Sequence, residues 1–250
     1  MRRRTWLLSV SALTAVGQAA IAQEAPSDLP IAFELDQLET PQNPIPVDSS
    51  LDNLGFDSQT GVANLATMNL DLGLSHSLNL QVAMSPLCYQ VGNLGSGDTT
   101  VRLKWSLWGN DGEASAFALM PYVKLPSASA GFGNGLIEGG IVAPLELGGP
   151  GDFGLGLLAQ IDLVGDEEAE YRPAFLFTGT LSHELLGAAE VFVEVEALFP
   201  STTIDDAAIA LNSGLSYPVG DDLVIDAGAR VGLSPAAQDL AVFVGASFHL

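Results

Sequence analysis

The chain of 250 residues is poor in cysteine and in basic side chains. Its single cysteine, Cys88, can form no disulfide within the chain, which excludes a disulfide framework and a cysteine-based zinc cluster. We expect this residue to fill space as a small apolar side chain. Only eight Lys and Arg stand against 30 Asp and Glu, giving a formal net charge of -22. Such an acidic surface repels nucleic acid, so no nucleic-acid partner is expected.

Beyond residue 22 the sequence also lacks any run of ~18 or more apolar residues, the length that a membrane-spanning helix needs. Hydrophobic residues nevertheless make up 48% of the chain, and the mean hydropathy is +0.32. An acidic disordered protein would be much less hydrophobic. The chain therefore has much apolar surface to remove from water, and it does not do so by forming a long apolar helix.

Residues 1–22 have the features of a signal peptide. Three arginines near the start precede an apolar segment over residues 6–20, and residues 20–22, Ala-Ile-Ala, give the small-x-small pattern of a cleavage site. We expect cleavage after Ala22 and export by the general secretory route. The remaining chain would keep five basic and 30 acidic side chains, which moves the formal net charge from -22 to -25.

Residues 23–44 are expected to form a periplasmic N-terminal tail, or to enter the folded domain as a plug. Their prolines disfavour regular structure.

Apolar residues then alternate with small or polar ones along most of the chain. In residues 99–108, for example, Leu103 and Trp105 alternate with Arg102 and Lys104. A period of two predicts strands with one apolar face. A strand of a soluble sandwich has about 5–6 residues, and a tilted strand that crosses a bilayer has about 9–11. The alternating runs here have the greater length, and their second face carries the small and ionisable residues of a barrel lumen.

We therefore predict an all-β fold, a closed antiparallel transmembrane β-barrel of about 12 strands over residues 45–250. The predicted strands are 45–57, 64–74, 78–88, 99–108, 115–125, 135–146, 153–164, 171–182, 190–199, 208–217, 222–233 and 240–250. The first rests partly on the even strand number of bacterial barrels. Short periplasmic turns should alternate with longer outer loops, of which 86–98 and 126–134 are clearly long, while the turn at 183–189 is longer than a periplasmic turn should be.

Ionisable residues at inward positions are the candidate functional residues. We predict that the lumen is lined by Asp71, Arg102, Lys104, Lys124, Glu138, Asp162, Glu194, Glu196, Asp226 and Arg230. Opposite charges on neighbouring strands should pair, for example Lys124 with Glu138. Two interpretations remain open: a charged constriction that selects solutes, or a network that fills a narrow lumen and fixes the barrel.

Aromatic side chains should lie near strand ends or on outward faces, as an interfacial belt or in ordinary packing. This group comprises Trp105, Trp108, Phe117, Tyr122, Phe153, Tyr171, Phe175, Phe177, Phe199, Tyr217 and Phe248.

The sequence offers no convincing catalytic set, and we predict that the protein is not an enzyme and uses no cofactor and no metal. Ser182, His183 and Glu184 are suggestive, but three consecutive residues of a turn cannot converge as a triad. The acidic loop residues 166–170 and 205–206 could bind Ca²⁺ weakly, although solvated loop acids explain them better.

The end of the chain, 240–250, alternates through Phe248 to Leu250 and resembles the C-terminal recognition strand of outer-membrane barrels. That resemblance implies contact with the barrel-assembly machinery. The block Gly-x-Gly-Asp-x-x-x-Arg-x-Lys, which starts at Gly95, is the most specific part of a second resemblance. Over residues 45–250 the chain resembles the bacterial family named for the meta-pathway of phenol degradation.

The family resemblance implies an outer-membrane barrel and passage of aromatic or other small hydrophobic compounds. We expect passive passage or binding of small molecules at the cell outer membrane, with outer-membrane lipid as a partner and the solute unspecified. Two alternatives stand beside this function: a structural barrel with a plugged lumen, and an outer-membrane lipid hydrolase.

Overall fold

The structure is a computed structural model in which every regular element is a β-strand. It describes residues 11–15, 30–34, 47–52, 55–56, 62–90, 92–109, 115–148, 153–165, 169–185, 189–200, 207–220, 223–237 and 239–249. The strands within these ranges are β1 (Ser11–Ala15), β2 (Pro30–Glu34), β3 (Val47–Asp52), β4 (Gly55–Phe56), β5 (Val62–Ser75), β6 (Leu78–Gln90), β7 (Asn93–Gly95), β8 (Thr99–Trp108), β9 (Ser115–Leu125), β10 (Glu138–Gly148), β11 (Phe153–Gly165), β12 (Tyr171–Glu184), β13 (Glu190–Phe199), β14 (Ala208–Pro218), β15 (Leu223–Gly232) and β16 (Leu240–His249). No helix in the described part of the chain is long and apolar enough to cross a membrane.

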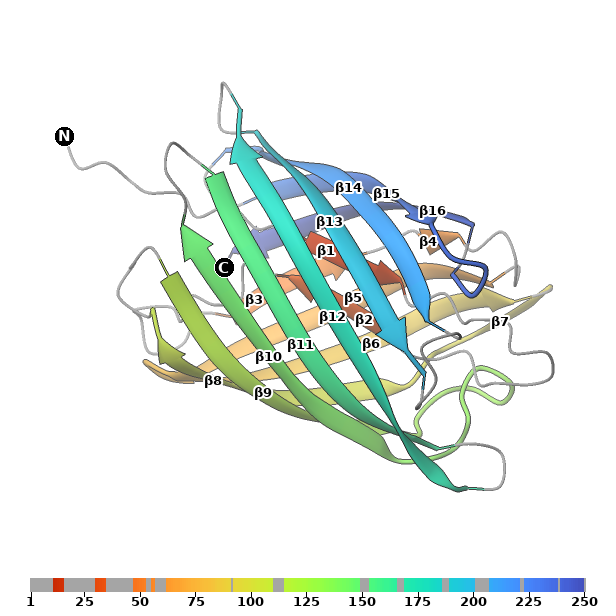
Figure 1. Cartoon of the computed structure of the whole chain (residues 1–250). Helices are drawn as coiled ribbons and strands as arrows, with labels where there is room; N and C mark the ends of the chain where they lie inside the picture. The colour runs from red at the N-terminus through yellow and green to blue at the C-terminus, as the bar shows by residue number, and fades with distance from the viewer. Residues whose placement is uncertain are drawn as a thin grey trace.

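One large antiparallel sheet contains β3 to β16. From β8 onward each strand pairs with the next strand of the sequence. At one end of this series β6 pairs with β8, and at the other end β16 pairs with β3. The strand β3 also pairs with β5, and β5 pairs with β6. Figure 1 shows the sheet curling round on itself, with its long strands tilted.

Eleven long strands, β5, β6 and β8 to β16, agree with predicted ones within about three residues at each end. The first prediction, 45–57, is the least accurate, because this segment holds the six-residue β3 and the separate two-residue β4. The connection after β12 is shorter than predicted, because β12 continues to Glu184 and includes His183.

The predicted outer loop 86–98 is wrong in its first half. The strand β6 continues to Gln90 and forms a hairpin with β7, in which Cys88 pairs with Gly95. Facing β5, the register shifts between the pairs Ala66–Leu87 and Met68–Met84. Pro86 lies in this interval and has no N–H to donate to the ladder, which accounts for the irregularity.

A separate two-stranded sheet pairs β1 with β2, and β1 contacts β14. The strand β2 starts at Pro30, so the prediction that residues 23–44 have no regular structure is wrong for residues 30–34. Proline is tolerated at the first residue of a strand. The strand β1 falls inside the expected signal peptide, and cleavage after Ala22 would separate it from β2. The signal peptide and the tail stay predictions.

The two faces of the sheet differ in chemistry. Along β11 the side chains of Leu155, Leu157 and Ile161 are exposed, while those of Gln160 and Asp162 are buried. We call these the outer face and the inner face of the sheet. Exposed large hydrophobic side chains occur on the outer face of every strand from β8 to β16. This arrangement is the reverse of a water-soluble domain, which hides its apolar face and exposes charge.

A row of four residues crosses the inner face from β13 to β16. Gly214 and Gly228 pair with each other, Phe192 pairs with Gly214, and Phe243 pairs with Gly228. A Cβ on Gly214 would lie 2.5 Å from the Phe192 ring, and one on Gly228 would lie 2.3 Å from the Phe243 ring. Each ring therefore covers a glycine of the neighbouring strand, and we call this row the Phe–Gly–Gly–Phe rung.

Candidate functional site

The ten predicted lumen residues all lie on the inner face or at its edge. They are Asp71 on β5, Arg102 and Lys104 on β8, Lys124 on β9, Glu138 on β10, Asp162 on β11, Glu194 and Glu196 on β13, and Asp226 and Arg230 on β15. Nine of them are buried, with exposed fractions of 8% or less, and Arg102 is half-buried. The period of two in each strand places them together on one face, and contacts join seven of them into three networks, which do not include Asp71, Lys104 and Asp226.

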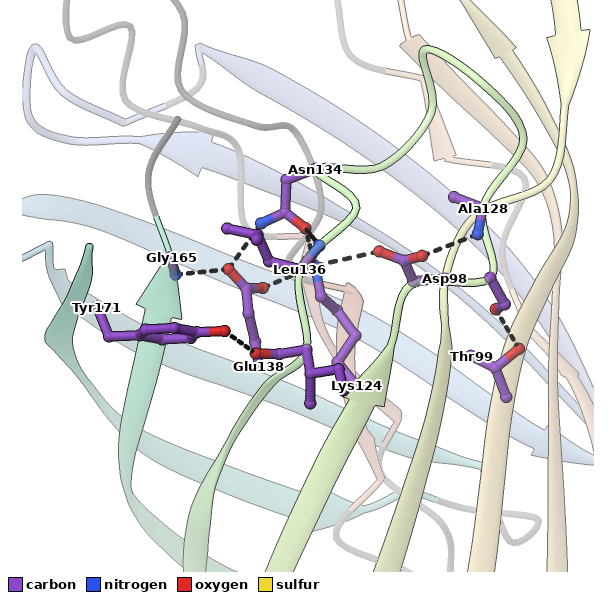
Figure 2. A network of polar contacts seen from close by, with 11 residues as sticks. Asp98, Thr99, Lys124, Ala128, Asn134, Leu136, Glu138, Gly165 and Tyr171 are labelled. Atoms are coloured by element: carbon purple, nitrogen blue, oxygen red, sulfur yellow. Dashed lines mark hydrogen bonds and ion pairs between the residues drawn. The ribbon is translucent and has the colours of Figure 1, made fainter. Parts of the chain in front are cut away.

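The first network surrounds Lys124 (Figure 2). Its Nζ lies 2.7 Å from Glu138 Oε2 and 3.2 Å from Asp98 Oδ2, and all three side chains are less than 5% exposed. Glu138 pairs directly with Lys124 across β10 and β9, so the predicted ion pair is confirmed. Asp98 was not among the predicted residues, because it precedes β8 in a segment that carries no strand alternation.

The same carboxylates hold the connection between β9 and β10 in place. Glu138 Oε1 accepts hydrogen bonds from Asn134 Nδ2 at 2.7 Å and from the backbone N–H of Gly165 at 2.8 Å. Asp98 Oδ1 accepts one from the backbone N–H of Ala128 at 2.9 Å. We call Asp98, Lys124, Asn134 and Glu138 the Lys124 clamp, and it ties one end of three strands to the loop 126–137.

The loop 126–137 also packs on β7. Ser96 N–H donates to Ser129 Oγ at 3.0 Å, and Ser129 N–H donates to the Ser96 carbonyl at 2.9 Å. Phe132 is only 7% exposed and covers Gly95, where a Cβ would lie 2.3 Å from its ring. The long loop therefore has a defined position.

The second network is a straight row across β12, β13, β14 and β15. Thr180 pairs with Glu194, Glu194 with Asn212, and Asn212 with Arg230. Thr180 Oγ1 donates to Glu194 Oε2 at 2.6 Å, and Asn212 Nδ2 donates to Glu194 Oε1 at 2.8 Å. Arg230 donates to Glu196 Oε1 at 2.7 Å, and Asn212 Nδ2 also reaches Glu196 Oε2 at 3.3 Å. We call this the Glu194 network.

The third network centres on Asp162. Its carboxylate accepts hydrogen bonds from the Tyr122 hydroxyl and from Gln160 Nε2, the latter at 2.8 Å. The guanidinium of Arg102 lies 6.0 Å from the centre of the Tyr122 ring and donates to Gln81 at 3.5 Å. The expectation that Tyr122 lies outward or at a strand end is wrong, because it is two residues from Lys124 and shares its inward face.

An apolar patch lies beside these networks on the inner face, and Tyr122 packs against it. Met120, Val142, Leu158, Leu176 and Leu198, from five consecutive strands, are 0–5% exposed and form one cluster. Met120 pairs with Val142, and Leu176 with Leu198. The inner face is therefore amphipathic, whereas the sequence analysis assigned small and ionisable residues to it and did not predict an apolar patch there.

The residues considered for catalysis do not come together. Ser182 and Glu184 lie on one face of β12, and His183 lies on the other, where it stacks on Phe153 with ring centres 4.2 Å apart. Of the acidic loop residues, 166–168 and 205–206 lie outside the described residues, and Glu170 forms an exposed ion pair with Arg172. Within the described residues no group of three or more His, Cys, Asp or Glu could hold a metal ion.

Solved structures of outer-membrane channels have the same architecture. An outer membrane channel from Pseudomonas putida F1 superposes with a TM-score of 0.61 at 9% identity, over 86% of this chain and 98% of that one. The NanC porin gives 0.55 at 12% identity, over 82% and 100%. The KdgM porin gives 0.52 at 14% identity, over 81% and 98%. At such low identities the likeness shows the fold, which is the all-β antiparallel fold of these porins.

Among curated protein sequences, none matches this chain. A family model does, and it matches residues 48–250. The match covers the whole large sheet apart from the first residue of β3, and so it includes all three polar networks. It confirms the resemblance carried by the Gly-x-Gly-Asp-x-x-x-Arg-x-Lys block. The chain belongs to the family described as "Putative MetA-pathway of phenol degradation".

Proposed function

We propose that this protein is a closed β-barrel of the bacterial outer membrane that lets small molecules pass. The observation that carries the proposal is the division of the sheet into an exposed apolar outer face and a buried charged inner face. Lipid can surround the apolar outer face, and an enclosed aqueous path can solvate the charged inner face. The pairings of β16 with β3, β3 with β5, and β5 with β6 support closure.

The fold shared with porins and channels supports the same role at the outer membrane. The ten inner-face charges would then line the lumen. Of the two interpretations of these charges, the Lys124 clamp fits the structural one, since it anchors the loop 126–137 to the strands. The Asp162 and Glu194 networks lie along the wall and fit the selective one.

The family description and the apolar patch together favour small aromatic or otherwise hydrophobic solutes. Such molecules would pass along Met120, Leu158 and their neighbours while the polar networks keep the path wet. The KdgM porin is known in complex with disordered oligogalacturonate, an acidic sugar polymer. An acidic ligand of that kind does not suit this chain, because its described residues include eight buried carboxyl groups and only three buried cations.

Conductance in a planar lipid bilayer tests the proposal. We expect the protein purified from outer membranes to produce discrete conductance steps, and double replacement of Arg102 and Lys104 by Gln to change their size. The same bilayers should show no steps when detergent alone is added. A bilayer that stays sealed around folded, inserted protein would contradict passage and favour a plugged structural barrel.

A further inference from the structure

Two carboxylate sites on the inner face, which we call the Glu194 station and the Asp162 station, have the same kinds of hydrogen-bond donors. In the first, Glu194 accepts hydrogen bonds from the Asn212 amide at 2.8 Å and from the Thr180 hydroxyl at 2.6 Å. In the second, Asp162 accepts them from the Gln160 amide at 2.8 Å and from the Tyr122 hydroxyl. Each station therefore has a carboxylate that accepts hydrogen bonds from an uncharged amide and an uncharged hydroxyl.

Each station also has a buried oxygen that accepts no hydrogen bond. Asn212 Oδ1 and Gln160 Oε1 have no partner, although the two side chains are 0% and 3% exposed. The amide orientations follow from the carboxylates, because turning either amide over would place two acceptors against each other. An unsatisfied buried acceptor is costly, so each of these oxygens favours a further donor or a cation. On the neighbouring strand, Nε and Nη1 of Arg230, which pairs with Asn212, are donors without a partner.

The net charge of the buried groups around the stations is negative. Eight carboxyl groups and three cations are buried among the described residues, and Arg102 adds a half-buried fourth cation beside Tyr122. Lys124 lies between two carboxylates, and Arg230 donates to Glu196. The local potential at the inner face is therefore negative, which raises the concentration of cations there and lowers that of anions.

We infer that the Glu194 and Asp162 stations bind cations in transit and make the path cation-selective. Carboxylate and amide oxygens supply the ligands, as rings of acidic side chains do in cation channels. The solutes that pass are then neutral molecules and small cations such as alkali or ammonium ions, and anions are rejected. This inference rests on the proposed function, because it requires an open path.

The reversal potential in a KCl gradient measures this selectivity directly. The wild-type protein should pass K⁺ more readily than Cl⁻. Glu194→Gln and Asp162→Asn keep the shape of each station and remove its charge, and each should lower the K⁺/Cl⁻ permeability ratio about twofold or more, since each removes one negative charge that attracts K⁺ and repels Cl⁻. The matched control is Glu170→Gln, an acid of the exposed pair with Arg172, which should leave the ratio unchanged.

The outcomes separate the inference from the function beneath it. Conductance without preference for K⁺, or a ratio that both station variants leave unchanged, overturns cation selectivity and leaves the channel intact. Absence of any conductance in the wild type overturns both. Heat-modifiable gel mobility confirms that each variant is folded, and if one variant fails to fold, the wild-type ratio and the other variant still decide.

Discussion

At the scale of single residues, Lys124 illustrates why the inner charges are arranged in networks. A buried ion pair stabilises a protein little more than apolar residues in place of both partners would. Removal of one partner alone is costly, because it leaves the other charge buried and unpaired. Lys124 Nζ forms ion pairs with two carboxylates, at 2.7 Å and 3.2 Å, so its removal would leave both Glu138 and Asp98 without this cation. Both carboxylates would keep only uncharged donors, and the loop 126–137 would lose part of its anchor.

We predict that Lys124→Met lowers the free energy of unfolding by about 3–5 kcal/mol, the cost of breaking a buried pair. Urea unfolding in phospholipid vesicles, followed by tryptophan fluorescence, measures the change. The control is Arg172→Met, whose pair with Glu170 is 3.7 Å long and more than 60% exposed on both sides. That variant should cost about 0–1 kcal/mol. Equal costs for the two variants would mean that the clamp adds no stability.

Single residues were also where sequence reasoning was least complete. Alternation placed ten charges on one face and led to the Lys124–Glu138 pair, because period and register follow from the strand itself. It missed Asp98 and misplaced Tyr122. Asp98 lies in a loop whose path depends on Ser96, Ser129 and the clamp, and such contacts have no periodic signature in the sequence.

At the scale of strands, the Phe–Gly–Gly–Phe rung shows how four neighbours fit together. Glycine in a strand weakens it unless another group fills the space above the backbone. Phe192 and Phe243, each 2% exposed, fill that space over Gly214 and Gly228. Because the rung lies beside the row of Glu194, Asn212 and Arg230, it also fixes the spacing of the strands that carry the Glu194 station.

We predict that Gly228→Ala destabilises the protein by about 1–3 kcal/mol, as overpacking does. Its new Cβ would lie 2.3 Å from the Phe243 ring and 2.5 Å from the Ser213 carbonyl oxygen, and the carbonyl belongs to the backbone and cannot turn away. The midpoint of guanidinium unfolding in vesicles is the measurement. The control is Gly179→Ala, where the nearest atom to the new Cβ, chain neighbours aside, is Leu157 Cδ2 at 3.8 Å, and its midpoint should not fall. A Gly228→Ala protein as stable as the wild type would refute the close packing.

Strand positions were well predicted wherever a long strand alternates between exposed and buried side chains, as in β8, β9 and β13. The sequence was less informative where a strand is short or irregular. The separation of β4 from β3, and the hairpin of β6 with β7, depend on which neighbour supplies the pairing, and that is a property of the folded sheet.

At the scale of the whole molecule, the outer face can show whether water or lipid surrounds the protein. Leu157 and Leu163 both lie on the outer face of β11, with exposed fractions of 40% and 53%. In water, replacement of either by a charged residue would cost little, since surface substitutions change stability by about 0.5 kcal/mol or less. In lipid, the cost depends on depth, and Leu157 lies nearer the middle of the strand than Leu163 does.

We predict that Leu157→Arg costs about 2–4 kcal/mol in vesicles and that Leu163→Arg costs about 0–1 kcal/mol, as expected for the midplane and the interface of a bilayer. Reversible guanidinium unfolding in phospholipid vesicles gives both values on the same strand and the same face. If the two substitutions cost the same small amount, the outer face does not contact lipid, and the proposed membrane barrel is wrong.

The join made by β3 has a consequence for the assembly of the molecule. The strand β3 pairs with β16 at only four positions, whereas β11 pairs with β12 at thirteen. The residues at this join come from opposite ends of the chain, so the entropy lost in bringing them together is among the largest in the fold, and few backbone bonds compensate for it. In the proposed barrel the wall should therefore be completed there last, and on warming it should first come apart along the same line.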